Sequence, residues 1–160
     1  MELMIFGKSI PVIEKIAEDD FVQFENDGIL VSVHGKPTSQ LLEEYSADLL
    51  YSQLCKIYDE MKNGGKIDIF GDLDFEIVNK IDGKDERIAK LKGRKILVKK
   101  SVIALPESAL RYMIAHEIAH IFTKRHTKKF WKIVETVYPD FKNGEKLLIK
   151  YGEHCTNNFK

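Results

Sequence analysis

Three of the five histidines in this chain lie within one short stretch, HEIAHIFTKRH, which runs from His116 to His126. His120 follows His116 by four positions, and residues with that spacing lie on one face of an α-helix, about 6 Å apart along its axis. Two imidazoles placed in this way can bind one metal ion. Zinc accepts imidazole nitrogen at about 2.0–2.1 Å and keeps three protein ligands in catalytic sites. The spacing therefore predicts a zinc site.

Glu117 completes the order H-E-x-x-H. On a helix its side chain points about 100° around the axis from His116, which places it beside the ion rather than on it. A carboxylate in that position can accept a proton from the water that the ion activates, as the general base of a metalloprotease does. The alternative is a set of ordinary core or surface histidines. We favour the metal site because two histidines and a glutamate on a largely apolar helix are costly to bury without a partner.

His126 is the expected third ligand. An unbroken helix would carry it some 9 Å beyond His120, too far to share the ion. The chain must therefore turn between about residues 123 and 126, and Thr127 could cap the helix that follows. Other residues that could supply the third ligand lie on later segments: Glu135, Glu145, Glu153 and His154.

Two segments before the motif have clear periodic patterns. Residues 21–33, FVQFENDGILVSV, alternate in polarity and break at Asn26-Asp27-Gly28, which predicts a hairpin with glycine supplying a positive φ. Residues 39–62 carry apolar side chains every three or four positions, which predicts one long amphipathic helix.

The remaining elements are shorter. Residues 66–83 and 87–105 are typical of short strands separated by glycine turns, and Pro106 begins the helix that carries the motif. A third helix is expected over TKKFWKIVETVYP, up to Pro139, and a last short one within NGEKLLIKYG. The order of strands, helix, strands and helices predicts an α+β fold in one domain, residues 1–160, because no linker divides the chain.

The stretch from Arg111 to Lys142 resembles the YgjP-like metallopeptidases. Their pattern is an H-E-L-x-H helix, a third histidine ten residues after the first, a Phe-Trp pair and a Pro-Asp-aromatic segment. In this chain the last two are Phe130-Trp131 and Pro139-Asp140-Phe141. The broader relatives are the SprT-like and WLM zinc proteases. The resemblance implies a zincin-like fold, with a twisted, mostly antiparallel sheet packed against a long helix and the active-site helix, followed by further C-terminal helices.

The resemblance also implies a zinc metalloendopeptidase that acts on peptides or proteins. Its ligands would be His116, His120 and His126, and Glu117 would be the general base. The chain departs from the pattern in two places. IAKLKGRK stands near the family's Trp-Gly-Ser-Cys stretch, and Thr123 stands where metzincins place a glycine.

Other roles are assigned by position alone. The partner that stabilises the oxyanion could be Tyr138, Tyr151 or His154, and Asp140 is either a turn residue or a residue that orients an imidazole. Residues 96–100, ILVKK, are expected to form an edge strand beside the motif helix. Its lysines would protect the edge, and an extended substrate would pair with it.

Composition bounds the alternatives. Lys+Arg and Asp+Glu number 25 each, 44% of residues are apolar, and no apolar run approaches the length of a membrane helix. The N-terminus lacks a signal-peptide pattern and there are only two cysteines, so we expect a cytoplasmic protein without a disulfide framework.

Two alternative functions remain. One alternative is a nucleic-acid-associated zincin that acts on DNA-bound proteins, and another is a metal-binding module without turnover. The first would use a basic cluster formed by Lys124, Arg125, Lys128, Lys129 and Lys132.

Overall fold

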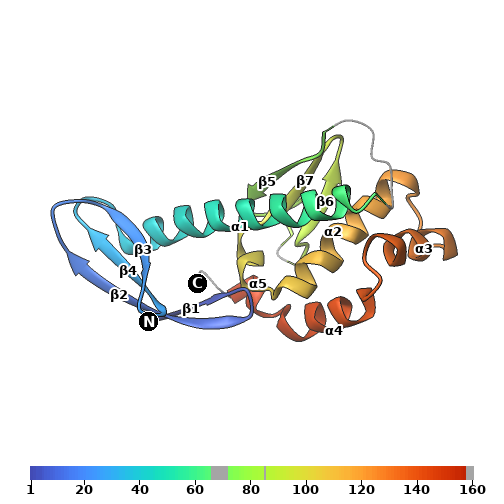
Figure 1. Cartoon of the computed structure of the whole chain (residues 1–160). Helices are drawn as coiled ribbons and strands as arrows, with labels where there is room; N and C mark the ends of the chain where they lie inside the picture. Colours follow the sequence, from blue (N-terminus) through green and yellow to red (C-terminus); the bar gives the residue numbers. More distant parts are fainter. Residues whose placement is uncertain (66–71, 85, 158–160) are drawn as a thin grey trace.

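The computed structural model describes residues 1–65, 72–84 and 86–157. These residues form an α+β protein with two mixed sheets, as the sequence predicts at this level (Figure 1). The strands are β1 (Glu2–Ile5), β2 (Lys8–Ile16), β3 (Phe21–Glu25), β4 (Gly28–Val33), β5 (Asp74–Val78), β6 (Ala89–Lys92) and β7 (Lys95–Lys99). The helices are α1 (Thr38–Asn63), the 3-10 turn η1 (Lys100–Ala104), α2 (Glu107–Phe122), α3 (Lys128–Val137), α4 (Phe141–Tyr151) and α5 (His154–Asn157). Part of the stretch in which strands were expected, residues 66–71, lies outside the described residues.

The first sheet has the order β1-β2-β4-β3, with β2 and β4 parallel and the other pairs antiparallel. The expected hairpin is present, but its turn differs from the prediction. Asn26 and Asp27 have the positive φ values, 52° and 61°, whereas Gly28 is already the first residue of β4. A two-residue turn with positive φ at both positions matches the twist of the strands. Gly28 lies in a tight space instead, because a Cβ there would lie 3.2 Å from the carbonyl oxygen of Pro11.

The second sheet has the order β5-β7-β6. The prediction that the segment ILVKK, which forms most of β7, lies at the edge of a sheet is therefore wrong. β7 pairs in parallel with β5 and antiparallel with β6, and is therefore central. Ile96 and Val98 are fully buried, and an apolar run of this kind is typical of an interior strand. The lysines protect no edge: Lys99 is only 7% exposed, and Lys100 forms an ion pair with Glu43 at 3.1 Å.

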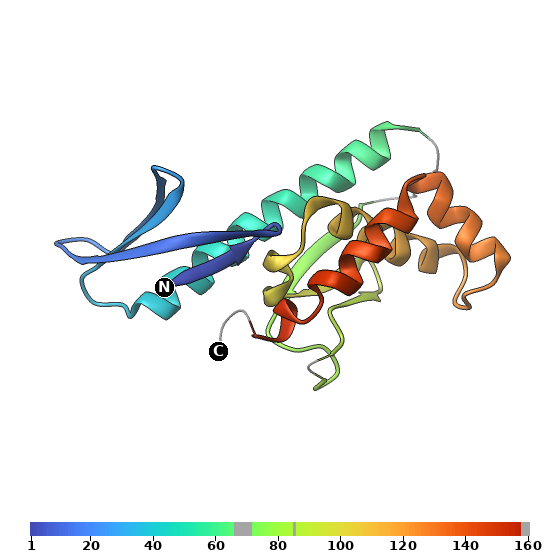
Figure 2. The ribbon, with the colours of Figure 1, turned by 90° about the horizontal axis from the view of Figure 1, so that it is seen from below.

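Helix α1 connects the two halves of the molecule. Its 26 residues extend over about 39 Å, and its first turns lie against β3 and β4 whereas later turns lie near β5 and α2 (Figures 1 and 2). Helix α2 is the most buried helix, with Leu110, Ile114 and Ile118 fully enclosed in the main core. Periodicity predicted the bounds of α1 to within one residue at each end, and Pro106 marked the start of α2 to within one residue.

Two close contacts fix α2. The turn between β1 and β2 donates from Phe6 N to the Ile103 carbonyl at 2.7 Å and from Gly7 N to the Ala104 carbonyl at 2.9 Å. This turn therefore holds η1, which leads directly into α2. On the other side α4 approaches α2 at Gly144, where a Cβ would meet the Ser108 carbonyl oxygen at 2.5 Å.

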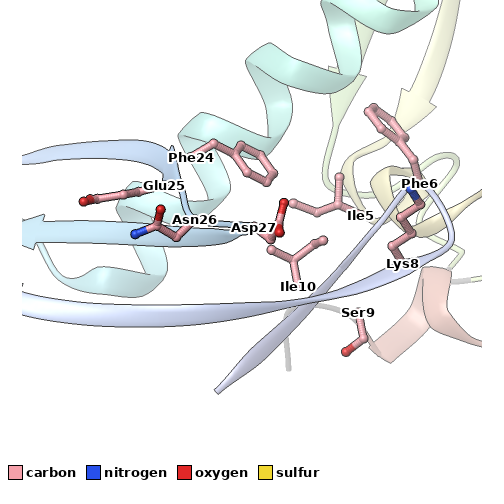
Figure 3. A pocket seen from close by; sticks show the side chains of 9 residues that line it. All are labelled: Ile5, Phe6, Lys8, Ser9, Ile10, Phe24, Glu25, Asn26 and Asp27. Carbon is pink, nitrogen blue, oxygen red and sulfur yellow. The ribbon is translucent and has the colours of Figure 1, made fainter.

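A pocket of about 720 Å³ lies between the β1–β2 hairpin and the β3–β4 turn (Figure 3). Ile5, Ile10 and Phe24 line it, together with Glu25 and Asp27 of the β3–β4 hairpin. None of the residues with an expected catalytic or metal-binding role is among its lining residues, so its volume alone does not make it the functional site.

The two cysteines are free, and Cys155 is fully buried, which raises the pKa of its thiol to about 11. No helix in the described part of the chain combines the length and the apolar character needed to cross a membrane.

Candidate metal centre and active site

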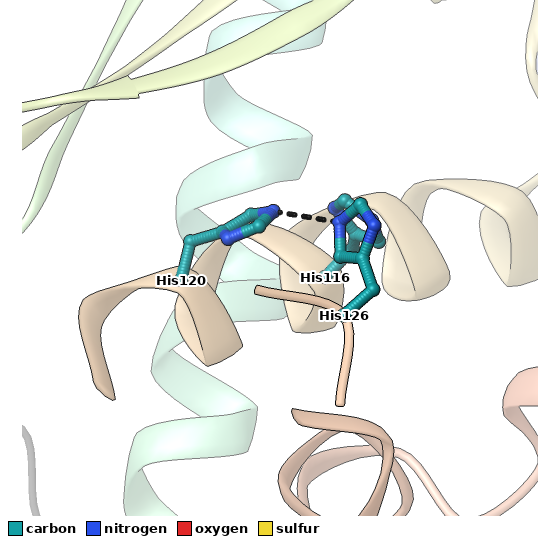
Figure 4. A group of neighbouring side chains, drawn as sticks. All are labelled: His116, His120 and His126. Carbon is teal, nitrogen blue, oxygen red and sulfur yellow. Dashed lines mark hydrogen bonds between the residues drawn. The ribbon is translucent and has the colours of Figure 1, made fainter. Parts of the chain in front are cut away.

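The structure brings His116, His120 and His126 together. The first two project from α2, and His126 reaches them from the loop between α2 and α3 (Figure 4). One possible ligand atom from each residue lies within 4.8 Å of those of the other two. Among the histidine, cysteine, aspartate and glutamate side chains that the structure describes, these three histidines form the group whose geometry could hold a metal ion.

The three rings are evenly placed. The centroids are 4.9 Å apart for His116 and His120, 5.1 Å for His116 and His126, and 5.0 Å for His120 and His126. The Nε2 atoms of His120 and His126 are 3.2 Å apart. Two nitrogens bound tetrahedrally to one zinc ion at about 2.0–2.1 Å are about 3.3 Å apart, so this pair fits a shared ion.

The chain turns where the third ligand requires it. Helix α2 ends at Phe122, and Thr123 has extended backbone angles. The Thr123 carbonyl oxygen lies 3.2 Å from Nδ1 of His120, which donates to it when Nδ1 carries the proton. That tautomer leaves Nε2 free to bind a metal. Thr127 occupies the N-cap position of α3, but its side chain makes no capping hydrogen bond, so that part of the prediction is wrong.

The protonation state of His120 also suits a ligand. Burial lowers the pKa of this imidazole, and the neighbouring His116 lowers it further. Both effects favour the neutral ring, which is the form that binds metal ions.

Glu117 lies beside the histidine cluster in a buried position. Its side chain comes from α2 and reaches β6, where the Leu91 N–H donates to Oε2 at 3.1 Å. Its other oxygen, Oε1, lies 3.6 Å from Nδ1 of His116. The residue is only 8% exposed. The carboxylate is therefore held by one hydrogen bond, with its second oxygen close to the histidines.

Phe130 forms the apolar floor of the cluster. Its ring is fully buried on α3, and its centroid lies 5.0 Å from that of His116 and 4.7 Å from those of both His120 and His126. The sequence placed Phe130 on an expected helix and in the Phe-Trp pair of the resemblance, but did not indicate contact with all three imidazoles. Such contact limits the rotamers that the rings can adopt.

We expect Phe130→Ala to destabilise the protein by roughly 3–5 kcal/mol, the usual cost of removing a buried phenyl ring. It should also weaken metal retention, because the three rings lose their common support. Chemical denaturation and metal analysis after dialysis measure the two effects. Lys129→Ala, one position earlier and exposed, is the matched control. Unchanged metal retention in a folded Phe130→Ala protein would contradict the role of the ring as a support.

The other predicted ligands and partners lie outside this cluster. Glu145 accepts a hydrogen bond from the Tyr112 hydroxyl at 3.0 Å, and the His154 ring packs against Tyr151 with centroids 6.1 Å apart. Asp140 is exposed and precedes α4, where its carbonyl rather than its side chain accepts from Asn143 N. This supports the interpretation of Asp140 as a turn residue. Glu135 and Glu153 do not join the described metal cluster. Tyr138, a candidate for the oxyanion, packs against the core cluster that contains Tyr112 and Phe130.

Tyr112 is an aromatic neighbour that the sequence did not single out. It lies one helical turn before His116, with ring centroids 6.0 Å apart. Burial and the hydrogen bond to Glu145 raise the pKa of its phenol. It therefore presents a neutral ring next to the candidate active site. The only sequence signal was its four-residue spacing from His116.

The basic cluster lies on the surface of the loop and helix that follow the motif. All five of its side chains are exposed: Lys124, Arg125, Lys128, Lys129 and Lys132. Neither their geometry nor any comparison with known proteins supports a nucleic-acid partner. A solvated helix face accounts for these residues.

Comparison with protein families bears directly on this site. The family model described as YgjP-like, metallopeptidase domain, matches residues 91–151. Over this segment the chain is similar to the YgjP-like metallopeptidases. The resemblance noted from the sequence is thereby confirmed. The YgjP-like segment contains the three histidines, Glu117 and Phe130, and it supports a peptidase that uses a metal ion and acts on peptides or proteins. No curated protein and no solved structure gave a significant match.

Proposed function

We propose that the protein is a zinc-dependent endopeptidase with a zincin-like catalytic half. The observation that carries the proposal is the convergence of three imidazoles, at centroid distances of 4.9–5.1 Å, beside a buried glutamate. Structural zinc sites usually include cysteine thiolates. Here Cys55 and Cys155 are outside the cluster, and a site that only held metal would not need Glu117.

Each residue of the site would have a separate role. His116, His120 and His126 would hold the ion, which when bound supplies a Lewis acid and lowers the pKa of water toward about 7. Glu117 would take the proton at Oε1, because Oε2 is occupied by the Leu91 N–H. It would then pass the proton to the leaving amine. The buried Phe130 ring would pack against all three imidazoles and limit their movement.

Substrate would bind along β6 rather than β7. β6 is an edge strand of its sheet and lies against α2. The Leu91 N–H points away from β7 but already donates to Glu117, so a peptide would pair with other backbone groups of this edge. A peptide in extended conformation can pair with such an edge through backbone hydrogen bonds, which give affinity with little dependence on sequence. Pairing here would bring the scissile bond to Glu117 and the histidines.

The test is metal analysis combined with proteolysis. We expect the purified protein to contain an equimolar amount of zinc and to cleave casein or a proteome-derived peptide library. Treatment with 1,10-phenanthroline should abolish cleavage and added zinc should restore it. Stoichiometric zinc without any cleavage across a broad library would instead favour a metal-binding module without turnover. Cleavage that survives complete metal removal would contradict the mechanism.

A further inference from the structure

A pocket of about 290 Å³ opens directly beside the candidate catalytic residues. Glu117 and His116 form part of its wall, and Ala89, the first residue of β6, forms another part. A peptide paired with β6 would therefore pass the mouth of this pocket. Its volume is at the lower end of the range for ligand pockets, roughly 300–1,000 Å³. It suits one side chain rather than a whole small molecule.

The walls are mainly apolar. Met113 on α2 and Leu148 on α4 face Ile88 and Ala89 at the start of β6. Tyr112 adds a ring whose hydroxyl is already bonded to Glu145 at 3.0 Å, so it offers an aromatic surface and no free donor. Among the described lining residues, the polar side chains besides His116 and Glu117 are Glu86, Arg87 and the Tyr112 hydroxyl, which is already bonded.

The charged residues at the mouth of the pocket do not favour a charged substrate side chain. Glu86 and Arg87 are both exposed at the mouth, one of each sign. The Arg87 guanidinium already lies 3.3 Å from a carboxylate oxygen of Asp82. An aspartate entering the pocket would lose hydration and approach the buried carboxylate of Glu117, and that loss is costly.

We propose that this pocket is a specificity subsite that accepts a large apolar side chain, such as phenylalanine, leucine or methionine, from the residue next to the scissile bond. The proposal rests on the peptidase function argued above and adds the class of substrate. Burying an apolar side chain of this size stabilises binding, whereas alanine would leave most of the pocket unfilled.

Binding can be tested without any turnover. Methyl NMR spectra of the protein are recorded with N-acetyl-phenylalaninamide and, in parallel, with N-acetyl-alaninamide. The phenylalanine compound is expected to shift the methyl signals of Ile88, Met113 and Leu148, and the alanine compound to leave them unchanged. Equal shifts with both compounds, or none with either, would overturn the proposal.

Substitutions of neighbouring residues on α4 sharpen the test. Leu148→Trp fills the pocket and should abolish the shifts at Ile88 and Met113. Ile149→Trp places the same side chain at a position that is 76% exposed and should leave the shifts as in wild type. Should Leu148→Trp fail to fold, Leu148→Ala, which removes wall atoms, is expected to weaken the binding several-fold. Wild-type binding in a folded Leu148→Trp protein, or in Leu148→Ala, would contradict the assignment of the wall.

Cleavage sites in a peptide library, read by mass spectrometry, separate this proposal from the one on which it rests. Large apolar residues are expected at one position flanking the cleaved bond, and Leu148→Trp should shift that position toward alanine and glycine. Cleavage without such a preference would overturn the subsite and leave the peptidase function standing. Selective methyl shifts without cleavage would show that the pocket binds large apolar side chains, but would overturn the peptidase function and with it the place of the pocket beside a scissile bond.

Discussion

Replacing Glu117 with glutamine is expected to lower peptidase activity by roughly 10²–10⁴-fold, the usual contribution of a positioned general base. Zinc content and melting temperature should stay close to wild type. The reason is that the glutamine oxygen can still accept the Leu91 N–H, which is 3.1 Å from Oε2 in the structure, whereas an amide cannot take up the proton from water. Steady-state rates on the peptide library, metal analysis and thermal unfolding measure the three quantities.

Glu107→Gln is the matched control for this experiment. Glu107 lies in the first turn of the same helix, is exposed, and pairs with Arg111 at 3.0 Å. The same chemical change at this position should leave cleavage unaltered. If Glu117→Gln cleaves as well as wild type, Glu117 is not the base. If it loses its zinc as well, the carboxylate has a structural role at the metal site.

Removing one histidine of the cluster is expected to have the largest effect on metal content. His116→Ala and His120→Ala should lose stoichiometric zinc, since each leaves only two of the three imidazoles that converge within 4.8 Å. His126→Ala should weaken binding strongly. His126 is exposed and held by a loop, so its removal disturbs the fold least. Elemental analysis after dialysis against metal-free buffer gives the content directly.

His34→Ala serves as the control, because His34 is exposed and its Nδ1 lies 3.3 Å from the Ala17 carbonyl, outside the cluster. It should retain all of the zinc. The ligand assignment would be wrong if His126→Ala kept full zinc while substitution of Glu135, Glu153 or His154 removed it.

The helices and the histidine cluster were accessible from sequence because each depends on local spacing. A four-residue interval fixes the face shared by His116 and His120, whatever the rest of the fold does. The length argument that required a turn before His126 was also local, and α2 does end at Phe122. Periodicity likewise located α1 and α3.

Relations between distant segments could not be predicted in the same way. The run ILVKK has the same residues whether it lies at the edge or in the middle of a sheet, and only the pairing with β5 on its second side makes it central. The contact of Leu91 with Glu117 joins residues 26 positions apart, and no motif marks it. The support that Phe130 gives to three imidazoles depends on how α3 packs on α2. Such packing is decided by the whole core.

The docking of the β1–β2 turn onto η1 has a consequence for how the molecule assembles. Phe6 and Gly7 satisfy the carbonyls of Ile103 and Ala104, so the approach to the active-site helix is completed by residues almost a hundred positions earlier in the chain. A contact between segments so far apart in the sequence carries a loop-closure entropy cost, and contacts of this kind form slowly during folding. We therefore expect α2, which carries the candidate catalytic residues, to be anchored late in folding. A fragment limited to residues 91–151 would contain His116, Glu117, His120 and His126 and still lack the turn that secures their helix.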